Sequence, residues 1–402
     1  MNQETIEAQY QGFVNQQLNL DLTRGKPCAE QLDLSNDLLS LASMHLAQDG
    51  TDVRNYGGLK GIPEARALGS WLLDAPAENV IAGGNSSLNL MYLVLAWRMK
   101  QLQAEGARKD PFTFICLVPG YDRHFTLCEH LGIKMIAVPL LDSGPDMAAI
   151  ENLVREDASI CGIWCVPKYS NPTGHTYSDD AVRRIAALPK LTPTPFLVMW
   201  DNAYAVHHLK DQEDRLANLF TLSGNEGTQD NVAIFGSTSK ITFAGAGVGF
   251  CGLSDANLLS FDQFMGEQMI GFDKLNQLKH AQFLSSPEKL ASHMAAHRRI
   301  LEPKFAEVYA ALTPLAAEGL VQFTAPAGGY FVSVDLTRAS AQAVVRLAAE
   351  AGVKLTPAGA TYPYGQDPLD ANLRIAPSFP KTEVLKQAME VFACCVRLAS
   401  LD

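Results

Sequence analysis

The stretch GSTSKITFAGAGVG, residues 236–249, places one lysine, Lys240, among small residues directly after the apolar run NVAIF. A surface lysine has polar neighbours and no need for so many glycines. A phosphate-binding P-loop is also excluded, because that motif has its glycines before the lysine, whereas here most of them follow. The stretch therefore predicts a strand that ends in a loop, where another group lies close to the backbone and the amine of Lys240 is directed at it.

Short apolar runs alternate with helical patterns on both sides of this stretch. Strands are expected at residues 79–84, 112–119, 134–140, 160–167, 196–203, 231–237 and 247–254. Helices are expected between them, including residues 86–104, 122–132, 146–156 and 178–188. Strands that are apolar on both faces and separated by helices predict an α/β fold, in which a mostly parallel seven-stranded sheet is sandwiched by helices. Ligands of such sheets bind beyond the carboxyl ends of the strands.

The pattern changes after about residue 275. Residues 289–320 have the pattern of one long amphipathic helix, and apolar runs, a helix near 340–351 and a closing helix follow. These segments predict a second, smaller α+β domain, onto which an N-terminal helix at about 2–18 and the segment LNLDLTRGKP fold. The expected division is a large domain at residues 46–285 and a small domain formed by residues 1–45 and 286–402.

Charge and composition exclude several classes of protein. The net charge is −11, from 43 acidic and 32 basic residues, which argues against a nucleic-acid partner. There is no signal peptide and no apolar run long enough to span a membrane, so a cytoplasmic protein is expected. The 8 cysteines have no CxxC spacing and most lie in apolar segments, which indicates buried free thiols and no metal site. The pair His207 and His208 lacks a second ligand pair.

Polar residues follow the expected strands at their carboxyl ends. Asn85, Ser86 and Ser87 lie where a helix begins, and the free N–H groups there favour an anion such as phosphate, although an ordinary helix cap explains this motif better when it is taken alone. An aspartate directly after an apolar strand is costly to bury unless it meets a cation. The other polar residues at these strand ends are Tyr121, Asn171, Asp201, Tyr204, Ser237 and Ser239.

One cofactor uses all these groups together. Pyridoxal phosphate requires a lysine for its Schiff base, a carboxylate on its pyridinium nitrogen, a cradle for its phosphate and a ring that stacks on it. Desolvation among glycines lowers the pKa of a lysine such as Lys240 and frees its amine as a nucleophile. Once displaced by substrate, that amine can carry the proton from Cα.

Seven motifs also occur in a characteristic order, namely YGGLKG, GGNSS, PGYDRH, NPTG, DNAY, STSK and LRIAPSF. This order resembles the class I aminotransferases of pyridoxal-phosphate fold-type I. TRGKP, PKYSNPTG and SKITFAGAGVG resemble the bacterial aspartate aminotransferase subgroup often called type Ic. The resemblance covers about residues 20–380 and implies that fold and that cofactor.

The resemblance also implies roles for individual residues. Lys240 forms the Schiff base, Asp201 pairs with the pyridine nitrogen, and Tyr121 stacks on the ring. Asn171 and Tyr204 hydrogen-bond the phenolic oxygen of the cofactor. The phosphate is held by Asn85, Ser86 and Ser237, with Ser87 and Ser239 beside them. Arg374 clamps the substrate α-carboxylate, and Gly25 lies in a loop that approaches the substrate.

Two further implications concern the phosphate. Tyr56, in NYGGLKG, reaches the phosphate of the neighbouring subunit, which requires a homodimer with shared active sites. Most of these enzymes have an arginine on the phosphate shortly after the lysine, but the aligned residue here is about Gly247. The phosphate must therefore find its charge elsewhere or rely on hydroxyl and N–H groups.

An arginine that holds the α-carboxylate in the ring plane opposes decarboxylation and favours transamination. The expected reaction is therefore transamination between an amino acid, L-aspartate by resemblance, and a 2-oxo acid, 2-oxoglutarate. A distal carboxylate needs another cation, for which Arg24 and Arg123 are preferred over Lys26 and Lys168. The same motifs are compatible with an aromatic or alanine-type aminotransferase, a β-lyase on the same fold, or a non-catalytic ligand sensor. A nicotinamide-dependent dehydrogenase is disfavoured, because GGNSSL lacks the GxGxxG spacing.

Overall fold

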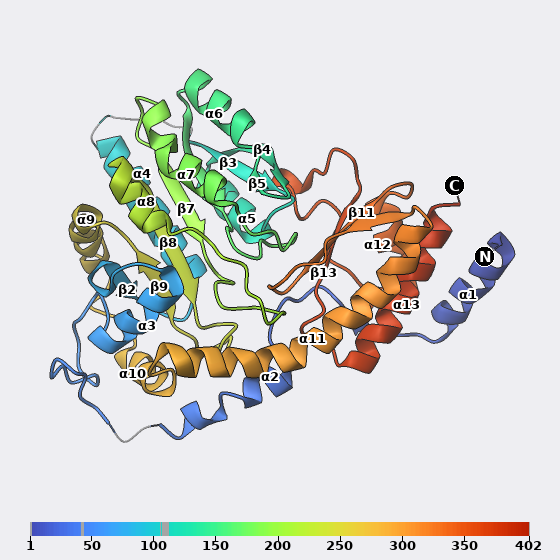
Figure 1. Cartoon of the computed structure of the whole chain (residues 1–402), viewed down its shortest axis with the longest axis horizontal. Coiled ribbons are helices and arrows are strands. Elements are labelled where there is room, and N and C mark those ends of the chain that lie inside the picture. Colours follow the sequence, from blue (N-terminus) through green and yellow to red (C-terminus); the bar gives the residue numbers. More distant parts are fainter. Residues whose placement is uncertain (1, 42–43, 105, 107–111, 402) are drawn as a thin grey trace.

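The computed structural model describes residues 2–41, 44–104, 106 and 112–401 of the chain (Figure 1). Its main feature is an eight-stranded sheet with the order β2-β9-β8-β7-β6-β3-β4-β5. The strands are β2 (Val80–Ala82), β3 (Thr113–Val118), β4 (Lys134–Leu141), β5 (Gly144–Pro145), β6 (Ile160–Cys165), β7 (Leu197–Asp201), β8 (Val232–Ser237) and β9 (Gly249–Gly252). All seven expected strands are present, and the α/β fold is confirmed. β5, too short to give a sequence pattern, extends one edge.

Strand direction explains where Lys240 lies. β8 pairs in parallel with β7 but antiparallel with β9, and β9 is also antiparallel to β2. A parallel neighbour requires a long crossover connection, usually a helix. Residues 238–248 contain no helix and return the chain directly, so β9 must run in the opposite direction. The Lys240 loop is therefore the connection between two adjacent strands, at the carboxyl end of β8.

Helices cover both faces of the large sheet. Alternate side chains of β7 point to opposite faces, so that Val198 and Trp200 join one hydrophobic cluster while Leu197 and Met199 join another. The first cluster includes side chains of α3 (Pro63–Leu73), α6 (Met147–Glu156), α7 (Asp179–Ala187), α8 (Leu219–Glu226) and α10 (Lys274–Phe283). The second includes side chains of α4 (Ser87–Ala104), α5 (Asp122–His130) and α9 (Asp255–Gly266).

The C-terminal part has its own core. β10 (Val321–Phe323), β11 (Val332–Leu336) and β13 (Asn372–Ile375) form an antiparallel sheet, which packs with α12 (Ala341–Glu350) and α13 (Thr382–Ala399). The N-terminal segment lies with this part, as expected from the sequence. Its helix α1 (Gln3–Asn15) packs against α13, and its strand β1 (Leu20–Asp21) pairs in parallel with β12 (Val353–Lys354).

One long helix, α11 (Pro287–Ala317), belongs to both cores (Figure 1). Leu290 and Met294 in its first half join the core of the large sheet, whereas Leu301 and Leu312 join the C-terminal core. The short helix α2 (Ala29–Asp33) lies beside α11. The expected division after residue 285 falls where α11 begins, and it stays a prediction.

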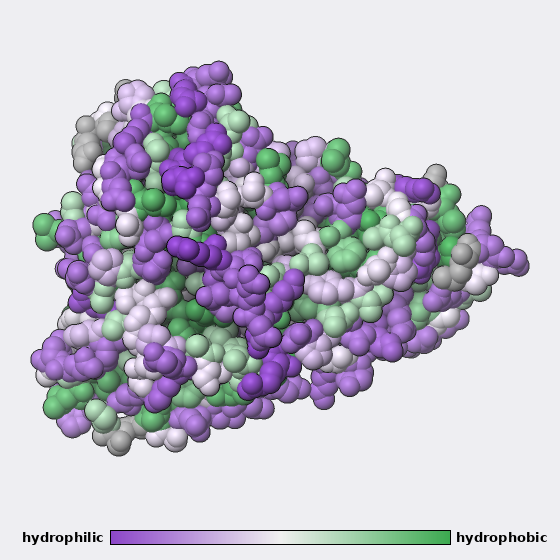
Figure 2. Space-filling view, in the orientation of Figure 1, coloured by the Kyte–Doolittle hydropathy of each residue, from purple (hydrophilic) through white to green (hydrophobic). Residues whose placement is uncertain are grey.

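The face of the molecule shown in Figure 2 is mostly hydrophilic, with hydrophobic residues scattered among the polar ones. None of the helices in the described part of the chain has the length and apolar character that a membrane span requires. All eight cysteines are buried and free. Within the same described residues, no group of three or more His, Cys, Asp or Glu side chains is arranged to hold a metal ion.

Candidate active site

The carboxyl ends of the parallel strands open into a cavity of about 700 Å³ between the two parts of the chain. Asp201 is the last residue of β7, Ser237 is the last of β8, and Lys240 follows three residues later. Tyr121 follows β3 and Asn171 follows β6, while Arg374 comes from β13 across the cavity. The sequence-predicted residues that line the cavity are Arg24, Gly25, Lys26, Tyr121, Arg123, Asn171, Tyr204, Lys240 and Arg374.

Lys240 is half-buried, and its main chain is held by side chains behind it. Its Nζ lies 5.0 Å from the centroid of the Tyr204 ring. Loss of hydration lowers the pKa of the Lys240 amine, and the negative charge of Asp201 partly opposes this shift. The Lys240 carbonyl accepts a hydrogen bond from the Tyr330 hydroxyl at 3.2 Å, and His207 Nε2 lies 3.3 Å from it. The amine therefore loses its proton at a lower pH than an exposed lysine does, while its backbone is anchored.

Asp201 is buried beneath the cavity, and only one of its two carboxylate oxygens has a hydrogen-bond partner in the described structure. Its Oδ2 lies 3.0 Å from His124 Nε2, and the His124 ring stacks on Trp164 with 4.0 Å between centroids. Asp201 Oδ1 is buried and has no hydrogen-bond partner among the described residues. A buried carboxylate oxygen without a partner is costly, so this atom marks a place for a hydrogen-bond donor or a cation.

Arg374 is a buried arginine on the opposite wall. Its Nη1 donates to Asp122 Oδ1 at 2.8 Å and to Asn171 Oδ1 at 3.3 Å. The guanidinium carbon lies 4.9 Å from the centroid of the Phe331 ring. Arg374 Nε and Asn171 Nδ2 are both buried without a hydrogen-bond partner in the described part of the chain. These donors are arranged for an anionic ligand that the protein itself does not supply.

Gly25 places its loop directly on Phe331. A Cβ added to Gly25 would lie 2.1 Å from Cζ of that ring, so no side chain fits there. Burial, together with the charges of Asp201 and Asp122, raises the pKa of the half-buried Tyr121 to about 12, and the Tyr121 hydroxyl therefore stays protonated. Burial also raises the pKa of Tyr204.

The residues predicted to hold a phosphate form a separate group beside the cavity, at the start of α4. Asn85 Nδ2 donates to the Gly245 carbonyl at 3.1 Å, and Ser239 Oγ donates to the Asn85 carbonyl at 3.4 Å. Ser86 Oγ accepts from Asn89 N at 3.3 Å, as a helix cap does. Ser237 accepts from the backbone N–H of Ser239 at 3.4 Å, and Ser87 is the first residue of α4.

Two of the glycines after Lys240, Gly247 and Gly249, pack against protein. The sequence predicted that they let another group approach the backbone. A Cβ on Gly249 would lie 2.9 Å from Ser87 N, and a Cβ on Gly247 would lie 3.0 Å from Ser239 N. These two glycines let the returning chain pack against α4 and against its own loop. A side chain at Gly247 would be tight against the backbone of Ser239, which would have to shift.

Tyr56 lies apart from the other predicted residues within one chain. Its side chain is 82% exposed, and it lines a different cavity together with Arg54, Phe272 and Lys274. The candidates for a distal carboxylate are also separated. Arg24 and Arg123 are exposed on the main cavity, and Arg24 Nε lies 4.0 Å from Asp21 Oδ2.

Lys26 and Lys168 were the other two candidates for binding a distal carboxylate. Lys26 is exposed, and its Nζ lies 3.9 Å from the centroid of the Phe379 ring. Lys168 is buried outside this cavity, where its Nζ lies 5.5 Å from the centroid of the Tyr169 ring. Burial lowers the pKa of Lys168, and the negative charges of Glu213 and Asp214 oppose this shift.

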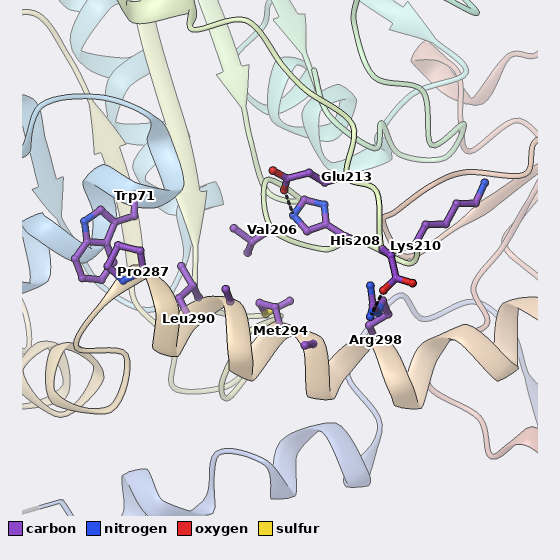
Figure 3. Close-up of a pocket in the computed structure, with 12 residues that line it drawn as sticks. Trp71, Val206, His208, Lys210, Glu213, Pro287, Leu290, Met294 and Arg298 are labelled. Atoms are coloured by element: carbon purple, nitrogen blue, oxygen red, sulfur yellow. Dashed lines mark ion pairs between the residues drawn. The ribbon is translucent and has the colours of Figure 1, made fainter.

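A second cavity of about 320 Å³ lies between α11 and the loop that follows β7 (Figure 3). Leu290 and Met294 of α11 form part of its apolar wall. At its rim, His208 Nε2 lies 2.7 Å from Glu213 Oε2, and Arg298 pairs with Asp211 at 2.7 Å. The two adjacent histidines therefore have different partners. His208 pairs with Glu213, whereas His207 Nε2 lies near the Lys240 carbonyl oxygen.

Sequence reasoning missed four residues of the site, namely Asp122, His124, Tyr330 and Phe331. His124 lies three residues after Tyr121, about one helical turn along α5, and this spacing could have indicated that the two side chains lie on the same side of the helix. Asp122 is adjacent to Tyr121 in the quoted motif PGYDRH, but only the fold brings it to Arg374. Tyr330 and Phe331 follow a Gly-Gly pair whose local pattern gives no indication of Lys240 or Arg374.

The buried atoms of this site fit pyridoxal phosphate. Asp201 Oδ1 is the unpaired carboxylate oxygen that a pyridinium nitrogen requires, and Asn171 Nδ2 is an unpaired donor for an oxygen. The amine with a lowered pKa and a helix start rich in hydroxyl groups lie beside the same strand ends.

Comparison with known proteins agrees with this arrangement. The fold and the site define a pyridoxal-phosphate-dependent aminotransferase, whose substrates are amino acids and 2-oxo acids. The model of a family described as aspartate aminotransferase matches residues 2–402, and the chain belongs to this family. It is 44% identical over 406 residues to an aspartate aminotransferase of Corynebacterium glutamicum, a match that covers 99% of this chain and 94% of the relative.

Solved structures agree with that assignment. The crystal structure of an aspartate transaminase from Corynebacterium glutamicum has a TM-score of 0.94 at 44% identity, covering 99% of this chain and 95% of that one. An α-aminoadipate aminotransferase from Thermus thermophilus shares the fold, with a TM-score of 0.78 at 22% identity over 96% of this chain and 94% of that one.

Proposed function

We propose that this enzyme transfers the amino group of L-aspartate to 2-oxoglutarate. The observation that carries the proposal is one cavity lined by both Lys240 and Arg374, above a buried Asp201 that has an unpaired oxygen. An amine with a lowered pKa and a buried guanidinium facing one space are what an amino acid substrate needs. The choice of aspartate is supported by the family and by a relative of that printed name at 44% identity.

The residues present divide the work of holding the cofactor. Lys240 Nζ would carry it, Asp201 Oδ1 would face its pyridinium nitrogen, and Tyr121 would lie on its ring. Asn171 and Tyr204 would bind its phenolic oxygen. Its phosphate would lie at the start of α4, against Asn85, Ser86, Ser87, Ser237 and Ser239. When bound, pyridoxal phosphate supplies an electron sink for the negative charge that develops at the substrate Cα.

Lys240 is also the proposed general base. Its lowered pKa keeps a fraction of the amine neutral at lower pH than an exposed lysine, so Nζ can accept the proton from the substrate Cα and return it. The anchored backbone limits where that nitrogen can reach. Arg374 fixes which bond is available, because a carboxylate held by the guanidinium is kept from leaving as carbon dioxide while the Cα hydrogen is presented to Lys240.

For the distal carboxylate of aspartate, we propose Arg123 in preference to Arg24. Both are exposed on the cavity, but Arg24 has Asp21 as a neighbour, whereas no ion pair of Arg123 occurs in the described part of the chain. Replacing Arg123 by alanine should therefore raise KM for aspartate far more than KM for alanine. Equal changes of KM for the two amino acids would contradict Arg123 as the residue that binds the distal carboxylate and would favour Arg24.

A homodimer completes the proposal. The side chain of Tyr56 is 82% exposed in the single chain, so it is available to a partner subunit. In a dimer Tyr56 would reach the phosphate of the partner. Mixing inactive Lys240→Ala subunits with Tyr56→Ala subunits should then restore activity, since each hybrid contains one site with both native residues.

The eight buried free thiols support a reducing compartment, the cytoplasm.

The test is the absorbance spectrum of the purified protein with pyridoxal phosphate, before and after L-aspartate is added. We expect a visible band that aspartate converts into a band at shorter wavelength, and 2-oxoglutarate should restore the first. Lys240→Ala should lack both the band and turnover while remaining folded. A spectral response to other amino acids but not to aspartate would contradict aspartate as the substrate. No band at all would overturn the role of Lys240.

A further inference from the structure

The carboxylate clamp proposed for this enzyme already holds a carboxylate of the protein. Asp122, the first residue of α5, accepts a hydrogen bond from Arg374 Nη1 at 2.8 Å. The side chain of Arg374 is only 7% exposed, whereas that of Asp122 is 30% exposed and belongs to the cavity wall. The pair therefore consists of a buried cation and an anion that can reach water.

The same nitrogen has no donor left for a ligand. Nη1 carries two hydrogens, and the second points to Asn171 Oδ1 at 3.3 Å. Arg374 Nε is buried and has no hydrogen-bond partner in the described chain, so it is less accessible to a ligand than the end of the guanidinium. A substrate that binds the end of the guanidinium through two parallel hydrogen bonds needs Nη1 as one of the two donors. It must therefore take the position of the Asp122 oxygen.

We propose that Asp122 occupies Arg374 in the empty enzyme, in the place of a substrate carboxylate, and is displaced by the α-carboxylate of the substrate. This inference rests on the role proposed above for Arg374. The exchange keeps the buried guanidinium paired with an anion throughout, which matters because an unpaired buried charge is strongly destabilising. Asp122 can move into water once released, because its carboxylate is already partly solvated.

The consequence is a cost shared by every ligand that takes this position. A ligand with a full carboxylate replaces the Asp122 carboxylate on equal terms. An amide or ester in the same place offers no negative charge, so it would leave Arg374 with a poorer partner than the one it lost. Displacing Asp122 costs both kinds of ligand the same free energy, so Asp122 lowers the affinity for each by the same factor, and the preference for a carboxylate comes from Arg374.

The test is Asp122→Asn, which keeps the shape of the side chain and removes its charge. KM for L-aspartate and for 2-oxoglutarate should each fall about threefold or more, the size of a partly exposed ion pair, with kcat little changed. Discrimination between aspartate and its α-amide should stay unchanged in this variant, because both ligands displace the same group. Asp122→Ser is the second variant, in case the asparagine still bonds Arg374 through its side-chain oxygen.

The matched control is Glu129→Gln. Glu129 is the other acid of α5 on the cavity wall, and within the described residues it forms no ion pair with Arg374. A general gain in positive potential would lower KM in both variants, whereas displacement of Asp122 predicts the change in Asp122→Asn alone. An unchanged KM in Asp122→Asn would overturn the inference, and a raised KM would show that Asp122 orients Arg374.

A binding measurement separates this inference from the proposed function. Succinate, a dicarboxylate without an amino group, is titrated calorimetrically into the cofactor-loaded wild type and into Asp122→Asn. We expect tighter binding of succinate to the variant, whichever amino acid the enzyme uses. Tighter binding of succinate together with no turnover of aspartate would support this inference and contradict aspartate as the substrate. Equal binding to the wild type and the variant would overturn this inference even if the enzyme turns over aspartate.

Discussion

His124 Nε2 lies 3.0 Å from Asp201 Oδ2, and both side chains are buried, at 2% and 5% exposure. The histidine is itself held in place, because its ring stacks on Trp164 and the edge of Tyr121 packs against it at 5.0 Å. One oxygen of Asp201 is thus fixed from behind, and the other, Oδ1, is left without a partner in the described chain. His124 therefore orients the carboxylate that is proposed to meet the pyridinium nitrogen.

Replacing His124 by phenylalanine tests this relationship. The ring can still stack on Trp164, but the hydrogen bond to Asp201 is lost and the carboxylate is free to turn. Hydrogen bonds to charged groups contribute about 1.5–3 kcal/mol, so the dissociation constant of pyridoxal phosphate should rise about tenfold or more. Absorbance titration with the cofactor measures it. Replacing the exposed His130 of the same helix should change nothing, and an unaltered His124→Phe would mean that Asp201 is held by other contacts.

A second prediction concerns the hydroxyl of Tyr330. It donates to the Lys240 carbonyl at 3.2 Å and accepts from Gln31 Nε2 at 2.9 Å, so it joins the N-terminal helix α2 to the lysine loop. Tyr330→Phe should lower stability by about 1–3 kcal/mol, because both partners lose a buried hydrogen bond. It should also lower kcat more than it raises KM, since the Lys240 amine is less well placed.

Tyr309 provides the control for that variant. It is a half-buried tyrosine of α11, and its hydroxyl has no hydrogen-bond partner in the described part of the structure. Tyr309→Phe should leave both stability and kcat close to wild type or slightly raise stability. Thermal unfolding and steady-state kinetics of the two variants measured side by side check the comparison. Equal effects in both would assign the loss at Tyr330 to packing.

Buried histidines behind the lysine loop predict how stability depends on pH. His293 Nε2 lies 2.7 Å from the Ile241 carbonyl, and His297 Nε2 lies 3.1 Å from His293 Nε2. Burial, with a smaller contribution from the charge of His293, lowers the pKa of His297 to about 4. The unfolded chain therefore binds more protons at this group between pH 4 and the ordinary value of 6.5. Stability must fall as pH falls through that window.

The expected slope from His297 is at most about 1.4 kcal/mol per pH unit, and it ends below pH 4 where the folded protein is protonated as well. Thermal unfolding between pH 7 and pH 4 measures it. His297→Gln should reduce the slope, whereas His130→Gln, an exposed histidine, should not. A wild type whose stability is constant over this window would contradict the buried neutral state of His297.

Local patterns predicted the fold because each strand and helix of the large sheet carries its own signal. The apolar runs around Cys116, Trp164 and Ile234 are buried on both faces, which is what a parallel sheet requires. The antiparallel β9 was not foreseen, although the missing helix between Lys240 and Gly249 implied it. Pairing direction follows from the length of a connection, and that length was available in the sequence.

Residues of the site were predictable where one strand end carries them and not where two distant segments meet. Asp201 is the last residue of β7 and Lys240 follows the end of the neighbouring β8 by three residues, so the sheet alone brings them together. The contact of Asp122 with Arg374 joins residues 252 positions apart, and nothing local to either indicates it. Tyr56 was placed at the phosphate of the neighbouring subunit by resemblance, and this stays a prediction, since within a single chain it lies at another cavity.

The contact between Gly25 and Phe331 gives the last prediction. A Cβ at residue 25 would lie 2.1 Å from Cζ of the ring and 2.5 Å from Cε1, so Gly25→Ala must push the loop or the ring aside. Phe331 also lies under the Arg374 guanidinium, so a shift of the ring disturbs the carboxylate clamp. KM for aspartate should rise about tenfold, as expected for an overpacked contact that costs about 1–3 kcal/mol.

Gly12→Ala is the matched control, because nothing lies within 4 Å of a Cβ there and the residue is inside α1. It should leave KM unchanged and raise stability by about 0.5–1 kcal/mol. Steady-state kinetics and thermal unfolding of both variants decide the matter, and a Gly25→Ala enzyme with a normal KM would show that this loop is free to move away from the substrate.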